Sequence, residues 1–277
     1  MRSPWLKRSI GYGLFALIIL ATVVYIRLPA NFLERYVVSR ITENQPDLLV
    51  TLADAKPQFP PGVQLDQLVI RFLSKGNATV EFERVSAIAA LARLFLGRLA
   101  FSVDARAYGG EIRGDVAFTD RFSSSGPIRT DMKFEEVNLG NCSYAKALSG
   151  RQIEGRASGT LLYSGTLQDS INGSGRLEIT LRDGSIRFLS PVFGLDKLDF
   201  NQAEGEAVLE NRTLKIRSLQ LAGRDFQGTF SGQILLDNDF QKSRLDMRGT
   251  LTFSGPNSSR QSISLTGPLA DPAVQFL

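Results

Sequence analysis

Apolar and polar side chains alternate along much of this chain, which is the pattern of a β-strand with one buried face. The first long run covers residues 99–107, and Gly109-Gly110 is the hairpin turn expected to follow it. The same alternation returns over residues 112–118, 153–163, 175–181, 226–236 and 245–253. Each run has one apolar and one polar side, as an antiparallel sheet covered on a single face requires.

The alternation changes parity at one position. Leu214 and Ile216 are even, whereas the next apolar residues, Leu219 and Leu221, are odd. An extra residue in one strand restores the apolar face after such a shift. We therefore predict a β-bulge near Arg217-Ser218.

Short helices and one loop interrupt the predicted strands. Between Val85 and Leu99, Ile88, Leu91, Leu94 and Phe95 recur at helical spacing, which predicts a short helix packed on the sheet. A helical turn is expected over Tyr144 to Leu148, ended by Gly150. Residues 56–62 are expected to form a loop, because their prolines remove backbone donors.

The amino-terminal region has a different pattern, with eighteen uncharged residues from Ser9 to Ile26. As a helix they would reach about 27 Å, close to the ~30 Å hydrocarbon core of a bilayer. We predict a cytoplasmic tail over residues 1–8 and a single transmembrane helix over 9–27. The apolar anchor side chains are Ile10, Leu14, Phe15, Leu17, Ile18, Ile19, Leu20, Val23, Val24 and Ile26, and the topology signal is Arg2, Lys7 and Arg8.

A cleaved signal peptide has the same basic-then-apolar layout and is the alternative to an anchor. Signal peptides have a shorter apolar run of ~7–15 residues and small side chains at the cleavage site. Here the run ends in bulky residues, over 23–28, which favours an uncleaved anchor. Residues 28–45 are predicted to form a juxtamembrane amphipathic helix with an apolar face of Leu33, Tyr36, Val37 and Ile41.

Glycines recur on the apolar parity of two predicted strands, as Gly155 with Gly159 and as Gly228 with Gly232. Glycine permits bends and a close approach of another backbone. Two interpretations stay open. The glycines let the sheet curl around something, or they make room for a neighbouring helix.

Charge and composition exclude several classes of protein. The net charge is +4, and the 32 Lys and Arg are scattered rather than clustered among aromatics, so nucleic-acid binding is not expected. No P-loop and no strand-linked G-x-G-x-x-G leading into a helix is present, so nucleotide binding is not expected either. The only cysteine, Cys142, has no internal disulfide partner, and we expect it to act as a small buried hydrophobe.

Catalytic chemistry has little support in the residues. The chain contains no histidine, which removes Ser-His-Asp and Cys-His systems and histidine-ligated metals. A glycosidase pair of carboxylates needs no histidine, and Glu135-Glu136 or Asp196 with Asp199 are the nearest candidates. Such residues are usually solvated charges. We predict a protein that is not an enzyme and has no cofactor or metal.

The final two-thirds of the chain resemble the AsmA-like superfamily of bacterial envelope proteins. The resemblance rests on Gln152–Leu161, Gly173–Gly175, Asp183–Ile186, Leu195–Phe200, Leu209–Ile216 and Leu265–Val274. With one short amino-terminal anchor and fewer than 300 residues, the chain is similar to the type II secretion system protein N family. The resemblance implies an elongated, curled antiparallel sheet of roughly 10–14 strands, with a few short helices, over residues 46–277.

The resemblance also implies a place and a role. The protein would be a single-pass protein of the bacterial inner membrane, with its β domain in the periplasm and other type II secretion proteins as partners. The alternative is phospholipid binding or transfer along an apolar face. The residues expected to form that face, as an open groove or as an ordinary core, are Phe226, Phe230, Ile234, Leu245, Met247, Leu251 and Phe253.

Overall fold

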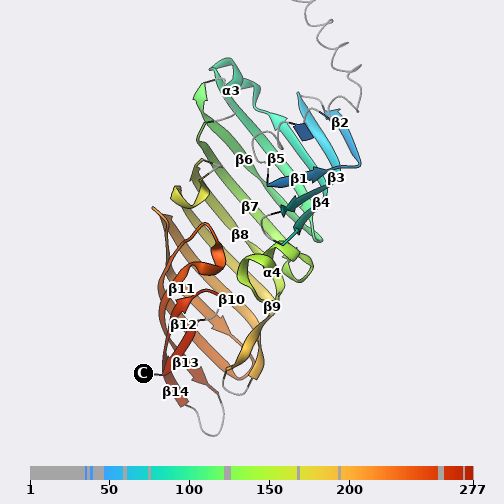
Figure 1. Ribbon diagram of the computed structural model, residues 1–277. Helices are drawn as coiled ribbons and strands as arrows, with labels where there is room; N and C mark the ends of the chain where they lie inside the picture. The colour runs from blue at the N-terminus through green and yellow to red at the C-terminus, as the bar shows by residue number, and fades with distance from the viewer. Residues whose placement is uncertain are drawn as a thin grey trace, which may run out of the picture.

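The chain forms one antiparallel β-sheet of fifteen strands, seen in a computed structural model (Figure 1). The structure describes residues 35, 38–39, 47–58, 61–73, 76–121, 126–166, 169–192, 195–254, 259–270 and 272–276. From β3 to β15 each strand pairs with the strand that follows it in sequence, whereas β1 and β2 lie one after the other along the free edge of β3, at residues 69–72 and 62–66. The sheet is therefore a long meander with two edges.

The first half of the sheet contains eight strands and both of the short helices. The strands are β1 (Leu48–Thr51), β2 (Asp54–Gln58), β3 (Gly62–Phe72), β4 (Ala78–Ala89), β5 (Arg98–Ala107), β6 (Gly110–Arg121), β7 (Ile128–Asn138) and β8 (Ile153–Gly165). The helices are α3 (Leu91–Phe95), between β4 and β5, and α4 (Ser143–Ser149), between β7 and β8.

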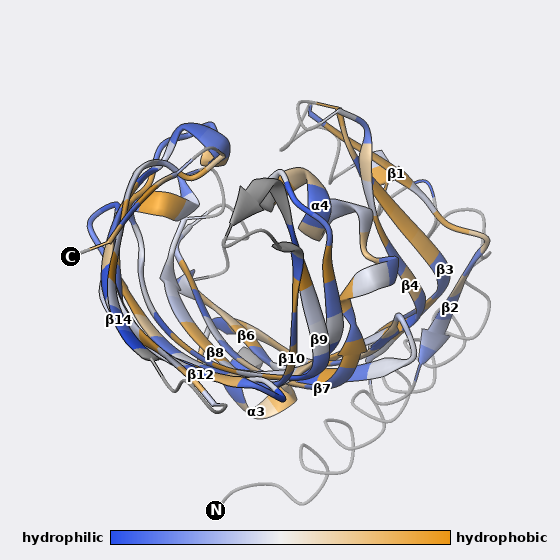
Figure 2. Ribbon diagram, turned by 90° about the horizontal axis from the view of Figure 1, so that it is seen from below, coloured by the Kyte–Doolittle hydropathy of each residue, from blue (hydrophilic) through white to orange (hydrophobic). Residues whose placement is uncertain are grey.

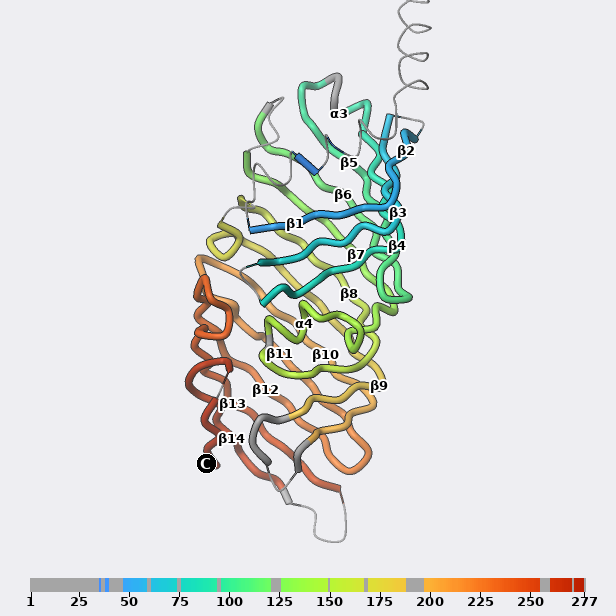
Figure 3. The backbone as a smooth tube through the Cα atoms, turned by 45° about the vertical axis from the view of Figure 1, so that its right-hand side comes forward, coloured from blue at the N-terminus to red at the C-terminus, as the bar shows by residue number. Residues whose placement is uncertain are grey.

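The second half contains strands and single helical turns only. The strands are β9 (Ser174–Val192), β10 (Leu195–Glu210), β11 (Thr213–Ala222), β12 (Phe226–Leu235), β13 (Arg244–Phe253), β14 (Ser259–Pro268) and β15 (Ala273–Phe276). The 3-10 turns are η3 (Ser170–Asn172) and η4 (Phe240–Lys242), and η2 (Leu139–Asn141) lies just before α4. Figure 3 shows these strands crossing the long axis of the molecule obliquely.

The prediction of a mainly β chain with one antiparallel sheet is confirmed, but the strand number is higher than expected. The expected loop over residues 56–62 is wrong in its first part, because Asp54–Gln58 form β2 and Pro57 lies opposite Val63. An edge strand tolerates proline, since its outward side donates to no ladder. The strands β1 and β15 have four residues each and also carry too little pattern to be recognised from the sequence.

The predicted bulge and turns are found close to their expected places. The register of β11 shifts against both neighbours around Arg217 and Ser218. The hairpin turn before β6 begins one residue early, because Tyr108 and Gly109 both have positive φ and Gly110 is already paired. Helix α4 ends at Gly150 in the left-handed conformation, as expected.

The helix predicted between Val85 and Leu99 is shorter than its pattern. Ile88 belongs to β4, and only Leu91–Phe95 are helical. Leu91 is 38% exposed, so this side chain does not cover the sheet as predicted. The prediction included Ile88 because it lies three residues before Leu91, a helical spacing, although Ile88 belongs to the end of a strand.

The sheet curls around its apolar face, and each end closes into a packed cluster (Figure 2). The carboxy-terminal cluster joins β10, β12, β13 and β14 and includes Phe200, Phe230 and Ile263. The amino-terminal cluster consists of Val50, Ala55, Leu65 and Leu68, with Val38 packed against it. We call the inner, apolar side of the curl the concave face and the outer, charged side the convex face.

The predicted tail, anchor and topology residues, over 1–27, lie outside the described residues, as does most of the predicted helix over 28–45. Arg35, Val38 and Ser39, the described residues of that segment, are helical. Among the described residues, no helix has both the length and the apolar composition needed to cross a bilayer.

Candidate functional site: the concave face

One row of directly paired residues crosses the concave face from β3 to β14. Residues that pair directly across antiparallel strands lie on the same face of a sheet. Every member of the row is apolar or glycine, so the alternation of each strand is in phase with that of its neighbours. The row is Leu65, Val85, Ala105, Ile112, Phe134, Gly159, Ile179, Gly205, Leu219, Phe230, Gly249 and Ile263.

Burial along this row is uneven. Leu65 and Ile263, at its two ends, are 7% and 2% exposed. In the middle the large side chains are only partly buried. We call the incompletely buried apolar residues on this face of β5 to β8, of which Leu161 is 37% exposed, the central patch: Phe101, Val103, Ile112, Val116, Phe118, Met132, Phe134, Leu161 and Tyr163.

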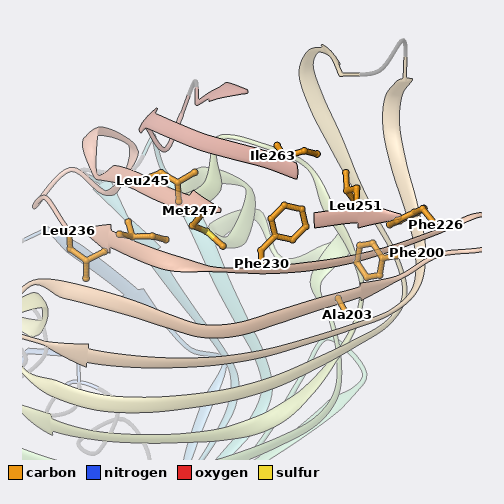
Figure 4. Packing of buried hydrophobic residues seen from close by; sticks show 10 residues of the cluster. Phe200, Ala203, Phe226, Phe230, Leu236, Leu245, Met247, Leu251 and Ile263 are labelled. Atoms are coloured by element: carbon orange, nitrogen blue, oxygen red, sulfur yellow. The ribbon is translucent and has the colours of Figure 1, made fainter. Parts of the chain in front are cut away.

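The residues proposed from the sequence lie in the closed part of this face rather than in the central patch. Phe226, Phe230 and Ile234 on β12 are at most 8% exposed. The β13 residues of the set, Leu245, Met247 and Leu251, are buried against them, and Phe253 is partly buried at the margin. Figure 4 shows the buried members Phe226, Phe230, Leu245, Met247 and Leu251 packed together with Phe200 from β10 and Ile263 from β14.

The sequence predicted three strands of the central patch, β5, β6 and β8, from their alternation, but not that their apolar side chains are incompletely buried. The runs over 99–107 and 112–118 were recognised as one apolar face, but alternation does not tell a packed residue from an open one. What separates them is packing between strands that are not direct neighbours in the sheet. Side chains of β10, β12, β13 and β14 pack into one buried cluster, whereas those of β5 to β8 on this face are not fully covered.

Glycines on the concave face make room for aromatic rings of neighbouring strands. A Cβ on Gly159 would overlap the backbone oxygen of Glu178 and lie 2.9 Å from the Phe134 ring, and a Cβ on Gly249 would overlap both the Phe230 ring and the backbone oxygen of Thr229. Of the two interpretations that the sequence left open, curling of the sheet agrees with Gly155, where φ is positive and the register of β8 shifts. Gly159 makes room for a ring of the next strand rather than for a helix.

The sheet bends along a line of irregular residues in its middle strands. Glu136 in β7 and Asp183 in β9 have positive φ, of 53° and 49°, and the register of β8 shifts at Gly155. The guanidinium of Arg156 forms ion pairs with both carboxylates, at 3.3 Å to Glu136 and at shorter range to Asp183. These pairs raise the pKa of Arg156, the hydrogen bond to Asp183 most of all.

Helix α4 fills a split in the sheet between β4 and β5. Only residues 84–89 of β4 pair with β5, so the Ala78–Glu83 half has no strand on that side. Its backbone is bonded by side chains instead: Thr79 N donates to Ser143 Oγ at 2.8 Å, and Glu81 N donates to Tyr108 OH at 2.9 Å.

Further contacts attach α4 to both halves of the molecule. The Tyr144 ring packs on Phe72 with centroids 4.3 Å apart. At the other end, Gln241 Nε2 from η4 donates to the carbonyl oxygen of Ala147 at 2.9 Å. Helix α4 therefore connects the amino-terminal strands with the carboxy-terminal ones across the concave side.

The pKa of Tyr108 is raised from an ordinary 10.0 to about 12. Burial is the main cause, because desolvation disfavours the phenolate. The backbone hydrogen bond from Glu81 acts in the opposite direction, and Cys142 adds a smaller upward effect. Cys142 itself is half-exposed at the start of α4 rather than buried as expected.

The carboxylates considered for glycosidase chemistry are engaged on the convex face. Glu135 pairs with Lys133 at 2.5 Å, which lowers the pKa of Glu135, and Glu136 pairs with Arg156. Asp199 pairs with Lys197 at 2.9 Å, and the Asp196 side chain lies outside the described part. Within the described ranges, no three His, Cys, Asp or Glu side chains gather closely enough to hold a metal.

Comparison with known proteins adds no relative to this picture. No family model, no curated protein and no solved structure matches the chain.

Proposed function

We propose that this chain is a non-enzymatic accessory component of the type II secretion system. It is held in the bacterial inner membrane by residues 9–27, with residues 46–277 in the periplasm. The observation that supports the proposal is the agreement between the fold and the resemblance. The resemblance implies one long, curled antiparallel sheet, and the strands from Leu48 to Phe276 form a sheet of that kind.

The two sheet edges bear on how such a component contacts partners. Short strands cover them: β1 and β2 cover β3, and β15 pairs with residues 263–266 of β14. Within the described chain, residues 259–262 of β14 have no strand on that side. An extended segment of a secretion partner can add there as a strand, since open edges are templates for β-augmentation.

Gene deletion tests the secretion role. Extracellular and periplasmic proteins are compared by quantitative mass spectrometry in wild-type, deleted and complemented cells. We expect folded exoproteins to accumulate in the periplasm of the deleted strain and to return to the medium with the full-length gene. An unchanged distribution of exoproteins contradicts the proposal.

The second candidate function is binding of phospholipid acyl chains, and the central patch favours it. Buried apolar surface contributes roughly 25 cal/mol per Å², so an incompletely buried apolar face gains free energy when an acyl chain covers it. Phe118 and Phe101 lie near each other there, with ring centroids 6.4 Å apart. The neighbouring clusters are already packed and offer no such gain.

Photocrosslinking in cells tests this candidate with the full-length chain. A benzophenone amino acid is placed at Phe118, in the central patch, or at Leu235, which is 53% exposed on the convex face. We expect phospholipid adducts at position 118 and not at 235, detected by mass spectrometry of the purified chain. Equal yields at both positions, or none at 118, contradict lipid binding by the central patch.

A further inference from the structure

The turn between β4 and β5 carries exposed apolar side chains at its tip. Helix α3 has the sequence Leu-Ala-Arg-Leu-Phe, and Leu96 follows it. Leu96 is 71% exposed, the highest value among the described large hydrophobic residues, and Leu91 is 38% exposed. Hydrogen bonds from Arg93 N to Ala90 O and from Leu96 N to Arg93 O hold the turn in shape.

Basic residues outnumber acidic ones around this tip, where the exposed Asp120 of β6 lies next to Arg121. Arg93 and Arg98 are exposed and flank the apolar residues, and no acidic residue occurs between Arg84 and Asp104. The register places Arg121 of β6 opposite Arg98. Leucines with flanking arginines suit the boundary between headgroups and acyl chains, since the leucines enter the apolar layer and the arginines meet anionic headgroups.

The position of α3 in the fold agrees with contact to a bilayer. It lies at the same end of the sheet as β2, opposite the carboxy-terminal strands (Figures 1 and 3). The two turns at that end touch, because Ala89 N donates to Pro61 O at 2.8 Å.

The tether to the membrane acts on this same end. Val38 packs against the amino-terminal cluster, twelve residues after Ile26, the last residue of the anchor run. Twelve residues span at most about 43 Å. This connection, which rests on the anchor of the proposed function, keeps the β1–β5 end of the sheet within reach of the bilayer. The full sheet extends over roughly 60 Å at ~4.8 Å per strand, so its other end is not held in the same way.

We propose that the α3 tip, residues 91–98, is a second membrane contact that inserts into the interface of an anionic bilayer. The anchor alone leaves the sheet free to swivel on its tether. A contact at the α3 tip fixes its orientation, with the β1–β5 end toward the membrane and the β15 end away from it.

Spin-label accessibility in vesicles tests this contact with the full-length chain. In a Cys142→Ser background, a nitroxide is placed at Leu96→Cys, at Leu235→Cys as a matched exposed leucine on the convex face, or at Leu17→Cys in the predicted anchor. The chain is reconstituted into vesicles of phosphatidylethanolamine with phosphatidylglycerol. Collision rates with oxygen, which concentrates in the acyl layer, are compared with those of a water-soluble nickel chelate.

The expected result is a lipid-like ratio at position 96 and an aqueous ratio at position 235. An aqueous position 96 together with a lipid-like position 17 overturns the second contact and leaves the anchor standing. Aqueous ratios at both 96 and 17 overturn the contact and the anchor together. Because Leu96 is mostly exposed, its replacement leaves the fold intact, and circular dichroism of the labelled chain checks this.

Discussion

The guanidinium of Arg156 lies between the carboxylates of Glu136 and Asp183, and so joins the irregular residues of three adjacent strands. Each carboxylate belongs to a residue with positive φ, a conformation that non-glycine side chains disfavour. Arg156 follows the register shift of its own strand at Gly155. One cation therefore stabilises the bend of β7, β8 and β9 from the convex side.

Charge reversal at Arg156 tests this arrangement. We expect Arg156→Glu to lower Tm by roughly 2–4 °C, because three carboxylates then face one another at the bend. Molar salt should recover part of the loss, since the Debye length falls to ~3 Å. Lys133→Glu is the control with the same change in net charge, because Lys133, among the described residues, pairs with Glu135 of its own strand and joins no neighbouring strand by an ion pair. Equal losses in the two variants contradict a special role of Arg156.

Adding one methyl group on the concave face tests the packing of rings over glycines. A Cβ on Gly228 would lie 2.9 Å from both Phe230 and Leu251. We expect Gly228→Ala to lower the free energy of unfolding by about 1–3 kcal/mol, as overpacking does. Chemical denaturation measures the change. In a Phe230→Leu background the loss caused by Gly228→Ala should be smaller, since the shorter side chain at position 230 removes one of the two overlaps.

Gly205 provides a matched control on the same face. Its added Cβ would meet Ile179 at 3.2 Å, which a small adjustment relieves. Alanine also lowers the conformational freedom of the unfolded chain, so Gly205→Ala should change the free energy of unfolding by less than about 1 kcal/mol. A loss as large as that of Gly228→Ala would show that the strand backbone, rather than the aromatic ring, limits these positions.

The raised pKa of Tyr108 predicts a loss of stability in alkali. Below pH 10 tyrosine is protonated in both states, so its contribution is constant. Between pH 10.0 and about 12 the unfolded chain loses this proton while the folded chain keeps it, and stability falls. Absorbance at 295 nm should show a tyrosine titrating near pH 12 that is missing in Tyr108→Phe.

A second variant separates the causes of this shift. Cys142→Ser removes the thiol that adds to the shift but leaves Tyr108 buried, so the late titration should persist. A midpoint that returns to the ordinary value in Cys142→Ser would mean that the thiol, and not burial, holds the proton on Tyr108.

The hydroxyl groups that bond the free half of β4 should slow exchange of its amides. We expect Ser143→Ala to speed hydrogen exchange at the Thr79 amide roughly five- to tenfold, which corresponds to one lost hydrogen bond. The Glu81 amide should stay protected in that variant, because it is bonded by Tyr108. Tyr108→Phe should reverse the pattern. Uniform acceleration over residues 78–83 in both variants would instead mean that α4 protects this half as a unit.

Much of the fold followed from the sequence because many strands carry a local signal. Alternation predicted β5, β6, β8, β9, β12 and β13, the parity change located the bulge at Arg217-Ser218 in β11, and Gly150 marked the end of α4. Five inner strands, β3, β4, β7, β10 and β14, were not recognised from alternation, and the four-residue strands β1 and β15 are too short to show a period. Pro57 also read as a loop signal, although a proline at a sheet edge breaks no ladder.

The site was harder to predict than the fold. Phe230 and Phe118 follow the same alternation, yet one is 6% exposed and the other is only partly buried. The difference is set by packing between strands that are not direct neighbours in the sheet. The strands are irregular at Glu136, Gly155 and Asp183, and of these three positions only Gly155 stood out in the sequence.

The pairing of each strand from β3 to β15 with its successor has a consequence for how the molecule is made. Every new strand docks on one that is already in place, so no long-range loop has to close before the sheet can grow. Proteins dominated by such local contacts reach their native state quickly. A chain that emerges amino end first can fold as it emerges, hairpin by hairpin, and it never exposes more than one unpaired growing edge.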